Sequence, residues 1–130
     1  MGNWHCKIDL NHVFTLQPTR PNTVFGIGAL SRIDAVLADL AKGGQGAVLV
    51  VTDAVAAKAS GAWEAVRPAL DAHVAWTLHD GVRPNPTLTN CDAAAAAGRE
   101  AKAQAVLAIG GGSVIDAAKI AAALLAHPGK

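Results

Sequence analysis

Two short segments of the chain are apolar at every position. They are residues 47–51 (Ala-Val-Leu-Val-Val) and residues 105–109 (Ala-Val-Leu-Ala-Ile). A strand with one face in water alternates apolar and polar side chains, so unbroken runs of this length are typical of strands buried on both faces of a parallel sheet. A third segment, residues 74–78, has a similar character, and we expect it beside the other two. The pattern predicts a parallel sheet that is covered by helices on both sides.

A helical pattern precedes the first of these strands. After Ser31, apolar side chains recur at positions 33, 36, 37 and 40, which is the spacing of one helix face. Asp34 stands three residues after Ser31, the position of the second partner in a capping box. Gly43 and Gly44 then end the pattern. We therefore predict a helix that begins near Ser31 and ends before Gly43.

Three further helices are predicted between and after the strands. One extends from about residue 53 toward residue 70 with a break near Ser60 and Gly61, and Pro68 indicates that its second half is short or irregular. Another covers residues 89–103, with alanines on one side and charged residues on the other. The last follows Gly112 and continues to about residue 126.

The order of these elements predicts the fold class. Strands and helices alternate along the chain, which favours an α/β domain with a Rossmann-like, doubly wound, mainly parallel sheet. Residues 13–25 contain Pro18 and Pro21 between short β-like segments, and we interpret them as a hairpin or edge strand with a loop. No repeat or linker divides the sequence, so we expect residues 1–130 to form one domain.

Composition excludes several classes of function. Of the 130 residues, 52% are hydrophobic and 16% are charged, and the 11 Lys and Arg are scattered among 10 Asp and Glu. We therefore expect neither a nucleic-acid partner, which needs a clustered basic face, nor a disordered chain. No uncharged run approaches the ~20 residues of a membrane span, and no membrane contact is expected. The first residues lack a signal-peptide pattern, which predicts a cytoplasmic protein with Cys6 and Cys91 reduced.

The stretch with the clearest chemistry joins the strand at residues 105–109 to the final helix through Gly110, Gly111 and Gly112. The free N–H groups of a first helical turn attract an anion, and glycine lets a ligand approach closely. We expect a phosphate or pyrophosphate on the N–H groups of Gly111, Gly112 and Ser113. No lysine follows the glycines, so this is not a P-loop. The alternative is a tight turn in which Ser113 and Asp116 form a capping box.

A carboxylate follows the other buried strand. Asp53 should lie at the same edge of the sheet as the glycines, because parallel strands place their carboxyl ends together and open α/β sheets bind ligands there. Its carboxylate would accept hydrogen bonds from both hydroxyls of an adenosine ribose and repel a 2′-phosphate. The alternative is that Asp53 caps a helix. In the common dinucleotide fold the glycines precede the acidic residue, whereas here Asp53 comes first.

Four motifs together resemble a known family. They are Phe-Gly-Ile-Gly-Ala-Leu at residues 25–30, Val-Thr-Asp at 51–53, Pro-Asn-Pro-Thr at 84–87 and Gly-Gly-Gly-Ser-Val-Ile-Asp-Ala-Ala-Lys at 110–119. In this order and spacing the chain is similar to the N-terminal, cofactor-binding domain of the iron-containing (group III) alcohol dehydrogenases. The resemblance implies the first half of a two-domain fold of the dehydroquinate-synthase-like type. It covers nearly the whole chain but only the first part of a family member.

The resemblance implies a role for each matching residue. Gly111, Gly112 and Ser113 would hold the pyrophosphate of the cofactor, and Asp53 would bind the adenosine ribose and favour NAD over NADP. Asn85 would contact the cofactor from its Pro-Asn-Pro turn. Asp116 would face the cleft near the nicotinamide half. Lys119 also matches, but as a partner of Asp116 at i+3 or a surface residue of the helix.

The resemblance also implies parts that this sequence does not contain. Family members hold Fe²⁺ or Zn²⁺ with one Asp and three His in a helical C-terminal domain, and none of His5, His12, His73, His79 and His127 shows a ligand spacing. We therefore predict no catalytic and no metal-binding residue in this chain, which alone would be inactive. The missing C-terminal domain or a second copy of the chain is the expected partner.

Two classes of function follow from these observations. In the first, the chain is the cofactor-binding part of an NAD-dependent, metal-assisted enzyme that transfers hydride between an alcohol or aldehyde and nicotinamide. A glycerol dehydrogenase or maleylacetate reductase type of relative is an alternative within this class. In the second, the chain is a non-catalytic short form that binds a nucleotide or pairs with another chain.

Overall fold

A computed structural model of the protein describes residues 14–16 and 23–127. It divides into two compact units, of which the first ends at Arg32 and the second begins at Ile33. In the first unit, strands β1 (Phe14–Leu16) and β2 (Thr23–Phe25) pair antiparallel, and the short 3-10 helix η1 (Ala29–Arg32) follows. The pairing confirms the hairpin predicted over residues 13–25. Pro18 and Pro21 lie outside the described residues.

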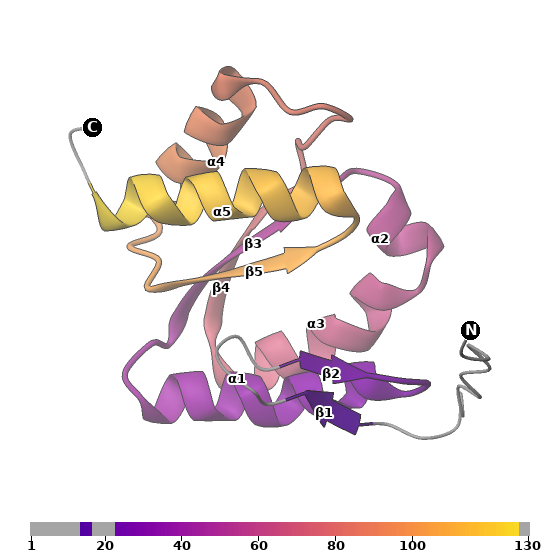
Figure 1. The fold of residues 1–130 in the computed structure, drawn as a ribbon. Helices are drawn as coiled ribbons and strands as arrows, with labels where there is room; N and C mark the ends of the chain where they lie inside the picture. Colours follow the sequence, from indigo (N-terminus) through magenta and orange to yellow (C-terminus); the bar gives the residue numbers. More distant parts are fainter. Residues whose placement is uncertain (1–13, 17–22, 128–130) are drawn as a thin grey trace, which may run out of the picture. The chain divides into compact units, whose positions relative to one another are not determined.

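The second unit is built on a parallel three-stranded sheet (Figure 1). Its strands are β3 (Ala47–Thr52), β4 (Ala75–His79) and β5 (Ala105–Ile109), in the order β4-β3-β5. Val50 lies opposite Leu78 on one side and Leu107 on the other, so the three strands are in register at their centres. The unbroken apolar runs therefore predicted the parallel strands correctly, although only the central strand β3 is buried throughout most of its length and the edge strand β5 is half-buried before Ile109.

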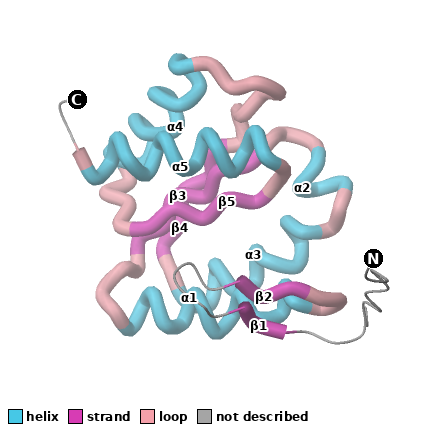
Figure 2. Tube along the Cα trace, in the orientation of Figure 1, coloured by secondary structure: helices cyan, strands magenta, loops and turns pink. Residues whose placement is uncertain are grey.

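Five helices complete this unit. They are α1 (Ile33–Lys42), α2 (Ala56–Ala59), α3 (Ala62–His73), α4 (Leu88–Glu100) and α5 (Gly112–Ala126). Helices α1 and α3 pack together on one face of the sheet, and α4 and α5 pack together on the other (Figure 2). This arrangement confirms the doubly wound α/β fold. No helix in the described part of the chain is long and apolar enough to cross a membrane.

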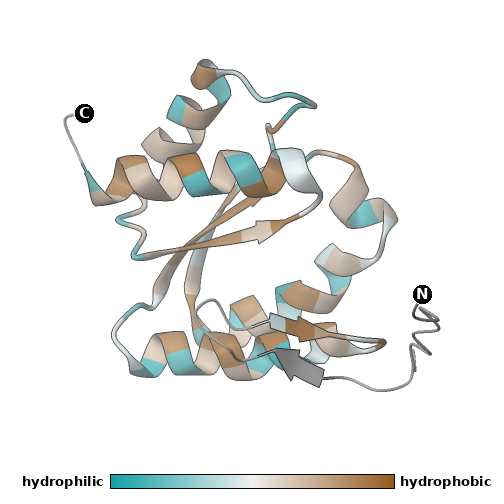
Figure 3. Ribbon diagram, viewed as in Figure 1, coloured by the Kyte–Doolittle hydropathy of each residue, from teal (hydrophilic) through white to brown (hydrophobic). Residues whose placement is uncertain are grey.

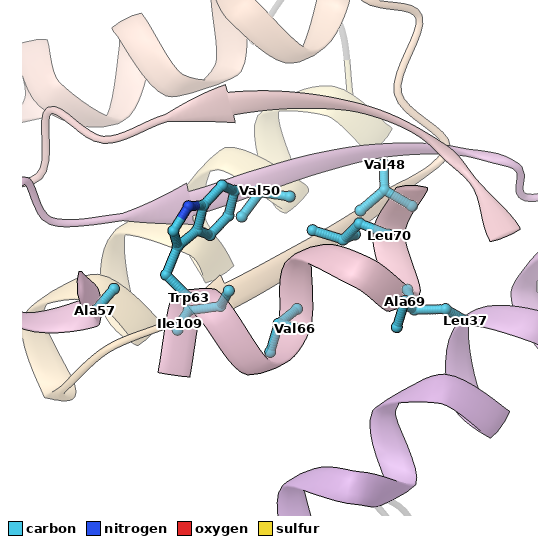
Figure 4. Close-up of a cluster of buried hydrophobic side chains, with 9 residues drawn as sticks. All are labelled: Leu37, Val48, Val50, Ala57, Trp63, Val66, Ala69, Leu70 and Ile109. Atoms are coloured by element: carbon cyan, nitrogen blue, oxygen red, sulfur yellow. The ribbon is translucent and has the colours of Figure 1, made fainter. Parts of the chain in front are cut away.

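The central strand β3 supplies side chains to two cores. Val48 and Val50 face α1 and α3, where they join a cluster that includes Trp63, Val66 and Leu70 (Figure 4). The alternate residues of β3 face α4 and α5 in a second cluster. Strands β3 and β5 accordingly appear mostly brown, the hydrophobic end of the scale, between the helices in Figure 3. Burial on both faces explains why the sequence of this strand shows no alternation.

The structure corrects the prediction for Pro68. Helix α3 runs without interruption from Ala62 to His73 and contains Pro68, whereas the break near Ser60 and Gly61 is confirmed by the separation of α2 from α3. Proline cannot donate to the carbonyl four residues before it, that of Glu64. Because both residues are exposed, water reaches that carbonyl. Buried side chains on the opposite face hold the helix onto the sheet.

Helix α1 begins close to the predicted position, but the capping box predicted for its start is wrong. The chain already turns in η1, and the Ser31 hydroxyl donates to the carbonyl oxygen of Gly28 at 2.8 Å instead of accepting from a later backbone N–H. In the second unit, Asp34 lies 2.9 Å from the His73 side chain at the end of α3. The predicted capping box is therefore absent from this stretch. Helix α4 ends at Glu100, earlier than predicted, and begins where the Thr87 side chain accepts from the N–H of Asn90.

Candidate functional site

The carboxyl ends of β3 and β5 are tied together by a buried side chain. Thr52 lies opposite Ile109 in the strand register, and its hydroxyl donates to the Ile109 carbonyl oxygen at 2.7 Å. Thr52 is 3% exposed, so this hydrogen bond is shielded from water. The residues that follow the two strands are Asp53 and Gly110. The fold therefore brings the predicted carboxylate and the predicted glycine turn to the same edge of the sheet, as expected.

The three glycines of the turn differ in what they require. Gly110 has a φ of +156°, and a Cβ added there would lie 2.6 Å from a methyl carbon of Val114. Gly110 is thus needed for the fold itself. At Gly111 and Gly112, an added Cβ would meet no described atom within 4 Å, and both residues are exposed. The backbone at these two positions is open to a ligand.

The structure decides against the capping-box interpretation of Ser113 and Asp116. Helix α5 begins at Gly112 with Gly111 as its N-cap, and no side-chain hydrogen bond caps it. Ser113 is therefore the second residue of the helix, two positions after the N-cap and too late to act as a cap. Its backbone N–H belongs to the first turn, whose N–H groups have no partner within the helix. The first turn of α5 is consequently free to bind an anion.

Asp53 has one established contact, with the start of the next helix. Its Oδ1 accepts from the backbone N–H of Val55 at 2.8 Å and from that of Ala56. These two N–H groups hold the pKa of the Asp53 carboxyl below its usual range, so the side chain is charged near neutral pH. Asp53 thus binds N–H groups at the start of α2, as the capping alternative expected, although the N-cap residue itself is Val55. These contacts do not conflict with a ribose contact, since both hydrogen bonds are made by Oδ1.

A pocket of about 490 Å³ lies over this edge of the sheet. Asp53, Gly111, Gly112 and Ser113 all line it, so four of the six predicted cofactor-binding residues share one cavity. The remaining lining residues come from the loop between β3 and α2, from the first residue of α2, from the loop after β4 and from the first turn of α5: Ala54, Val55, Ala56, Val82, Arg83, Pro84 and Val114. The volume falls within the range of small-molecule sites.

The other two predicted residues do not line this pocket. Asn85 is exposed between two prolines and adopts the left-handed conformation, with a φ of +53°. Asp116 is exposed on α5, as is Lys119. The pocket wall nearest to Asn85 in sequence is Pro84. Contacts of Asn85 and Asp116 with a cofactor remain predictions.

Two residues of the site were missed in the sequence. Thr52 was noted only as the end of a strand, and its role depends on the register of two strands. Arg83 lines the pocket beside the Pro-Asn-Pro turn, but no spacing rule connects it to the glycines. The sequence feature that could have identified Arg83 was a positively charged residue next to a proline turn, after the carboxyl end of a predicted parallel strand.

The described residues offer no metal centre. No group of three or more His, Cys, Asp or Glu side chains lies close enough there to hold a metal ion. His5, His12 and Cys6 lie outside the described part of the chain, and Cys91 is a buried free thiol, as predicted. The residues described here thus do not fit a catalytic metal, and we assign them no step that uses one.

The pocket combines two kinds of recognition. A charged carboxylate accepts hydrogen bonds from neutral hydroxyl groups and repels phosphates nearby. The open glycine backbone and the first turn of α5 attract an anion through unpaired N–H groups and the helix dipole. A ligand that suits both carries a sugar and a phosphate. This is the chemistry of a nucleotide, at the sheet edge where open α/β folds bind ligands.

Comparison with known sequences agrees with this geometry. The family model described as "Iron-containing alcohol dehydrogenase" matches residues 20–130. The chain is 45% identical over 128 residues to a long-chain primary alcohol dehydrogenase of Thermoanaerobacter ethanolicus, a match that covers 98% of this chain and 32% of that protein. A long-chain-alcohol dehydrogenase of Geobacillus thermodenitrificans is 31% identical over 109 residues, which are 84% of this chain and 27% of the relative. The chain spans about a third of the length of these relatives.

Solved structures show the same similarity. The NADH-dependent butanol dehydrogenase A of Thermotoga maritima superimposes with a TM-score of 0.68 at 32% identity, over 75% of this chain and 25% of that one. A 1,3-propanediol oxidoreductase gives a TM-score of 0.69 at 29% identity, over 79% of this chain and 26% of that one. The similarity therefore extends to the three-dimensional fold of about three quarters of this chain.

Proposed function

Because this chain belongs to the iron-containing alcohol dehydrogenase family, we propose that it is the NAD-binding part of a metal-assisted alcohol dehydrogenase. The substrate would be a small alcohol or aldehyde. The observation that carries the proposal is the single pocket that Asp53 shares with Gly111, Gly112 and Ser113. It is supported by the NADH dependence named for the Thermotoga maritima structure.

The residues of the pocket fit a dinucleotide. Gly111 and Gly112 leave open backbone where a Cβ would otherwise stand, so a pyrophosphate has room to approach their N–H groups. Asp53 is charged and half-buried, which suits a hydrogen bond from each ribose hydroxyl. The same charge disfavours a 2′-phosphate and therefore favours NAD over NADP. When bound, the nicotinamide would supply hydride acceptance or donation.

The chain's own contribution to the reaction is binding and orientation. Thr52 fixes the distance between the two strand ends, so the ribose-binding carboxylate and the phosphate-binding turn keep a constant separation. The metal, Fe²⁺ or Zn²⁺, would be held by residues outside the described part. The cytoplasmic location and a partner, either a second copy or a metal-binding domain, stay predictions.

The test is a titration of this chain with NADH and NADPH, followed by nucleotide fluorescence. We expect saturable binding with NADH favoured by about tenfold or more, the change that ~1.4 kcal/mol produces. An Asp53→Asn variant keeps an Oδ1 acceptor for the N–H groups of Val55 and Ala56 but loses the charge. It should therefore reduce the preference for NADH over NADPH without unfolding α2. Asp53→Gly removes the charge and the cap together.

The outcomes separate the parts of this proposal. Absence of saturable NADH binding would contradict the assignment of the pocket to a dinucleotide. Binding that discriminates equally well in Asp53→Asn and in the unmodified chain would leave the nucleotide site standing but remove the ribose role of Asp53.

A further inference from the structure

Arg83 lines the pocket, and neither the sequence motifs nor the proposed function uses it. It lies in the loop that connects β4 to α4. We infer that Arg83 is a phosphate-binding residue of this pocket, whose guanidinium contacts the pyrophosphate of the dinucleotide together with the first turn of α5. The inference rests on the proposed function and identifies a residue that adds to it.

The backbone of Arg83 is held in place on both sides. Val82 is 5% exposed, packs in the core beneath α4 and α5, and its N–H donates to the carbonyl oxygen of Thr52 at 3.4 Å. Pro84 follows Arg83, and a residue before proline is restricted to extended conformations. The loop therefore places Arg83 at the pocket wall with little freedom of its backbone.

The charges around the pocket leave Arg83 without a counter-ion. Asp53 and Arg83 are the two formally charged side chains that line it. The described ion pairs are Arg67 with Asp71 and His73 with Asp34, so neither involves Arg83, and the described hydrogen bonds of the Asp53 carboxylate go to backbone N–H groups. The N-terminus of α5, which carries partial positive charge, faces the same space. Arg83 and the first turn of α5 are thus two positive groups of one pocket for which no ion pair is described, and they favour an anionic ligand.

The chemistry of the guanidinium suits a phosphate. Its planar N–H donors match the oxygens of a phosphate in two parallel hydrogen bonds, which an ammonium group does not reproduce. The pyrophosphate is the assigned anion because the open glycine backbone lines the same pocket. A 2′-phosphate is disfavoured because it would have to lie beside the Asp53 carboxylate.

The experiment compares ligands with and without phosphate. This chain and its Arg83→Gln and Arg83→Lys variants are titrated with NADH, NADPH, ADP-ribose and adenosine. Arg99→Gln is the matched control, since Arg99 is exposed on α4 and does not line the pocket. Circular dichroism establishes that each variant is folded.

We expect Arg83→Gln to raise the Kd for NADH and ADP-ribose about tenfold, as loss of a charge-assisted hydrogen bond does. The Kd for adenosine should stay unchanged. For NADH and ADP-ribose, the Kd of Arg83→Lys should lie between those of the unmodified chain and Arg83→Gln, and the Kd of Arg99→Gln should match that of the unmodified chain. The salt dependence of NADH binding should also weaken in Arg83→Gln, since one ionic contact is lost.

Four results would overturn the inference. Equal losses for adenosine and ADP-ribose would mean that Arg83 acts on the nucleoside or on the fold of the loop. A loss confined to NADPH would place its contact at the 2′-phosphate. Unchanged NADH binding in Arg83→Gln would remove the contact while leaving the proposed function intact, whereas failure of the unmodified chain to bind NADH would remove both.

Discussion

At the scale of single residues, the buried hydroxyl of Thr52 is the contact that holds the two sides of the pocket together. Replacing Thr52 by Val keeps the shape of the side chain but leaves the Ile109 carbonyl oxygen without its donor. Loss of a buried hydrogen bond in this way costs about 1–3 kcal/mol. We expect a drop of that size in the free energy of unfolding, measured with urea. Thr52→Ser, which keeps the hydroxyl, should lose less, and equal stability of Thr52→Val and the unmodified chain would contradict the role.

The capping contact of Asp53 predicts a dependence on pH. Backbone N–H groups lower the pKa of the folded carboxyl from its ordinary 3.8. A carboxyl with a lower pKa in the folded state stabilises the fold above the unfolded value, and this contribution is lost as pH falls through the folded-state pKa. Urea unfolding at a series of pH values should show the unmodified chain losing more stability below about pH 4 than Asp53→Asn. Parallel profiles would show that the cap does not depend on charge.

Residues differ in how far their roles could be predicted from the sequence. Asp53 and the glycines were found because the chemistry of carboxylates and of glycine turns is visible at strand ends. The bond from Thr52 joins positions 57 residues apart, so it depends on strand register, which an apolar run does not specify. Arg83 depends on where a proline loop folds back over the sheet. Neither the Thr52 hydrogen bond nor the position of Arg83 is marked by a periodic pattern in the sequence.

At the scale of elements, α3 carries an avoidable cost. Pro68 lies inside the helix on its exposed side, where it leaves one carbonyl to water. Alanine is about 3 kcal/mol more favourable than proline in a helix interior. Part of this gain is offset, because proline also lowers the conformational entropy of the unfolded chain. We expect Pro68→Ala to raise the free energy of unfolding by about 1–2 kcal/mol in urea denaturation. Pro68→Gly should gain about 1 kcal/mol less, and a destabilised Pro68→Ala would contradict this account.

Elements were predicted better than their boundaries. The strands were identified because burial on both faces leaves a continuous apolar run, and each was placed within one residue. The helix caps were misjudged at Ser31 and Ser113, since a serine near a helix start is a cap only when its backbone is extended there. In both cases the turn had already begun at an earlier residue, Ala29 in η1 and Gly112 in α5. Pro68 was misjudged because packing of the opposite face outweighed its local cost.

At the scale of the whole molecule, the described residues provide the pocket that we propose for a dinucleotide, without a group of metal ligands. We therefore predict that this chain binds NADH but does not oxidise or reduce alcohols or aldehydes when Fe²⁺ or Zn²⁺ is supplied. Polarisation of the alcohol oxygen requires a coordinated metal, and hydride transfer is slow without it. The measurement is the absorbance of NADH over time, with the Thermoanaerobacter ethanolicus dehydrogenase as the active control. Steady turnover by a sample whose intact mass matches the sequence would show that this chain holds the metal itself.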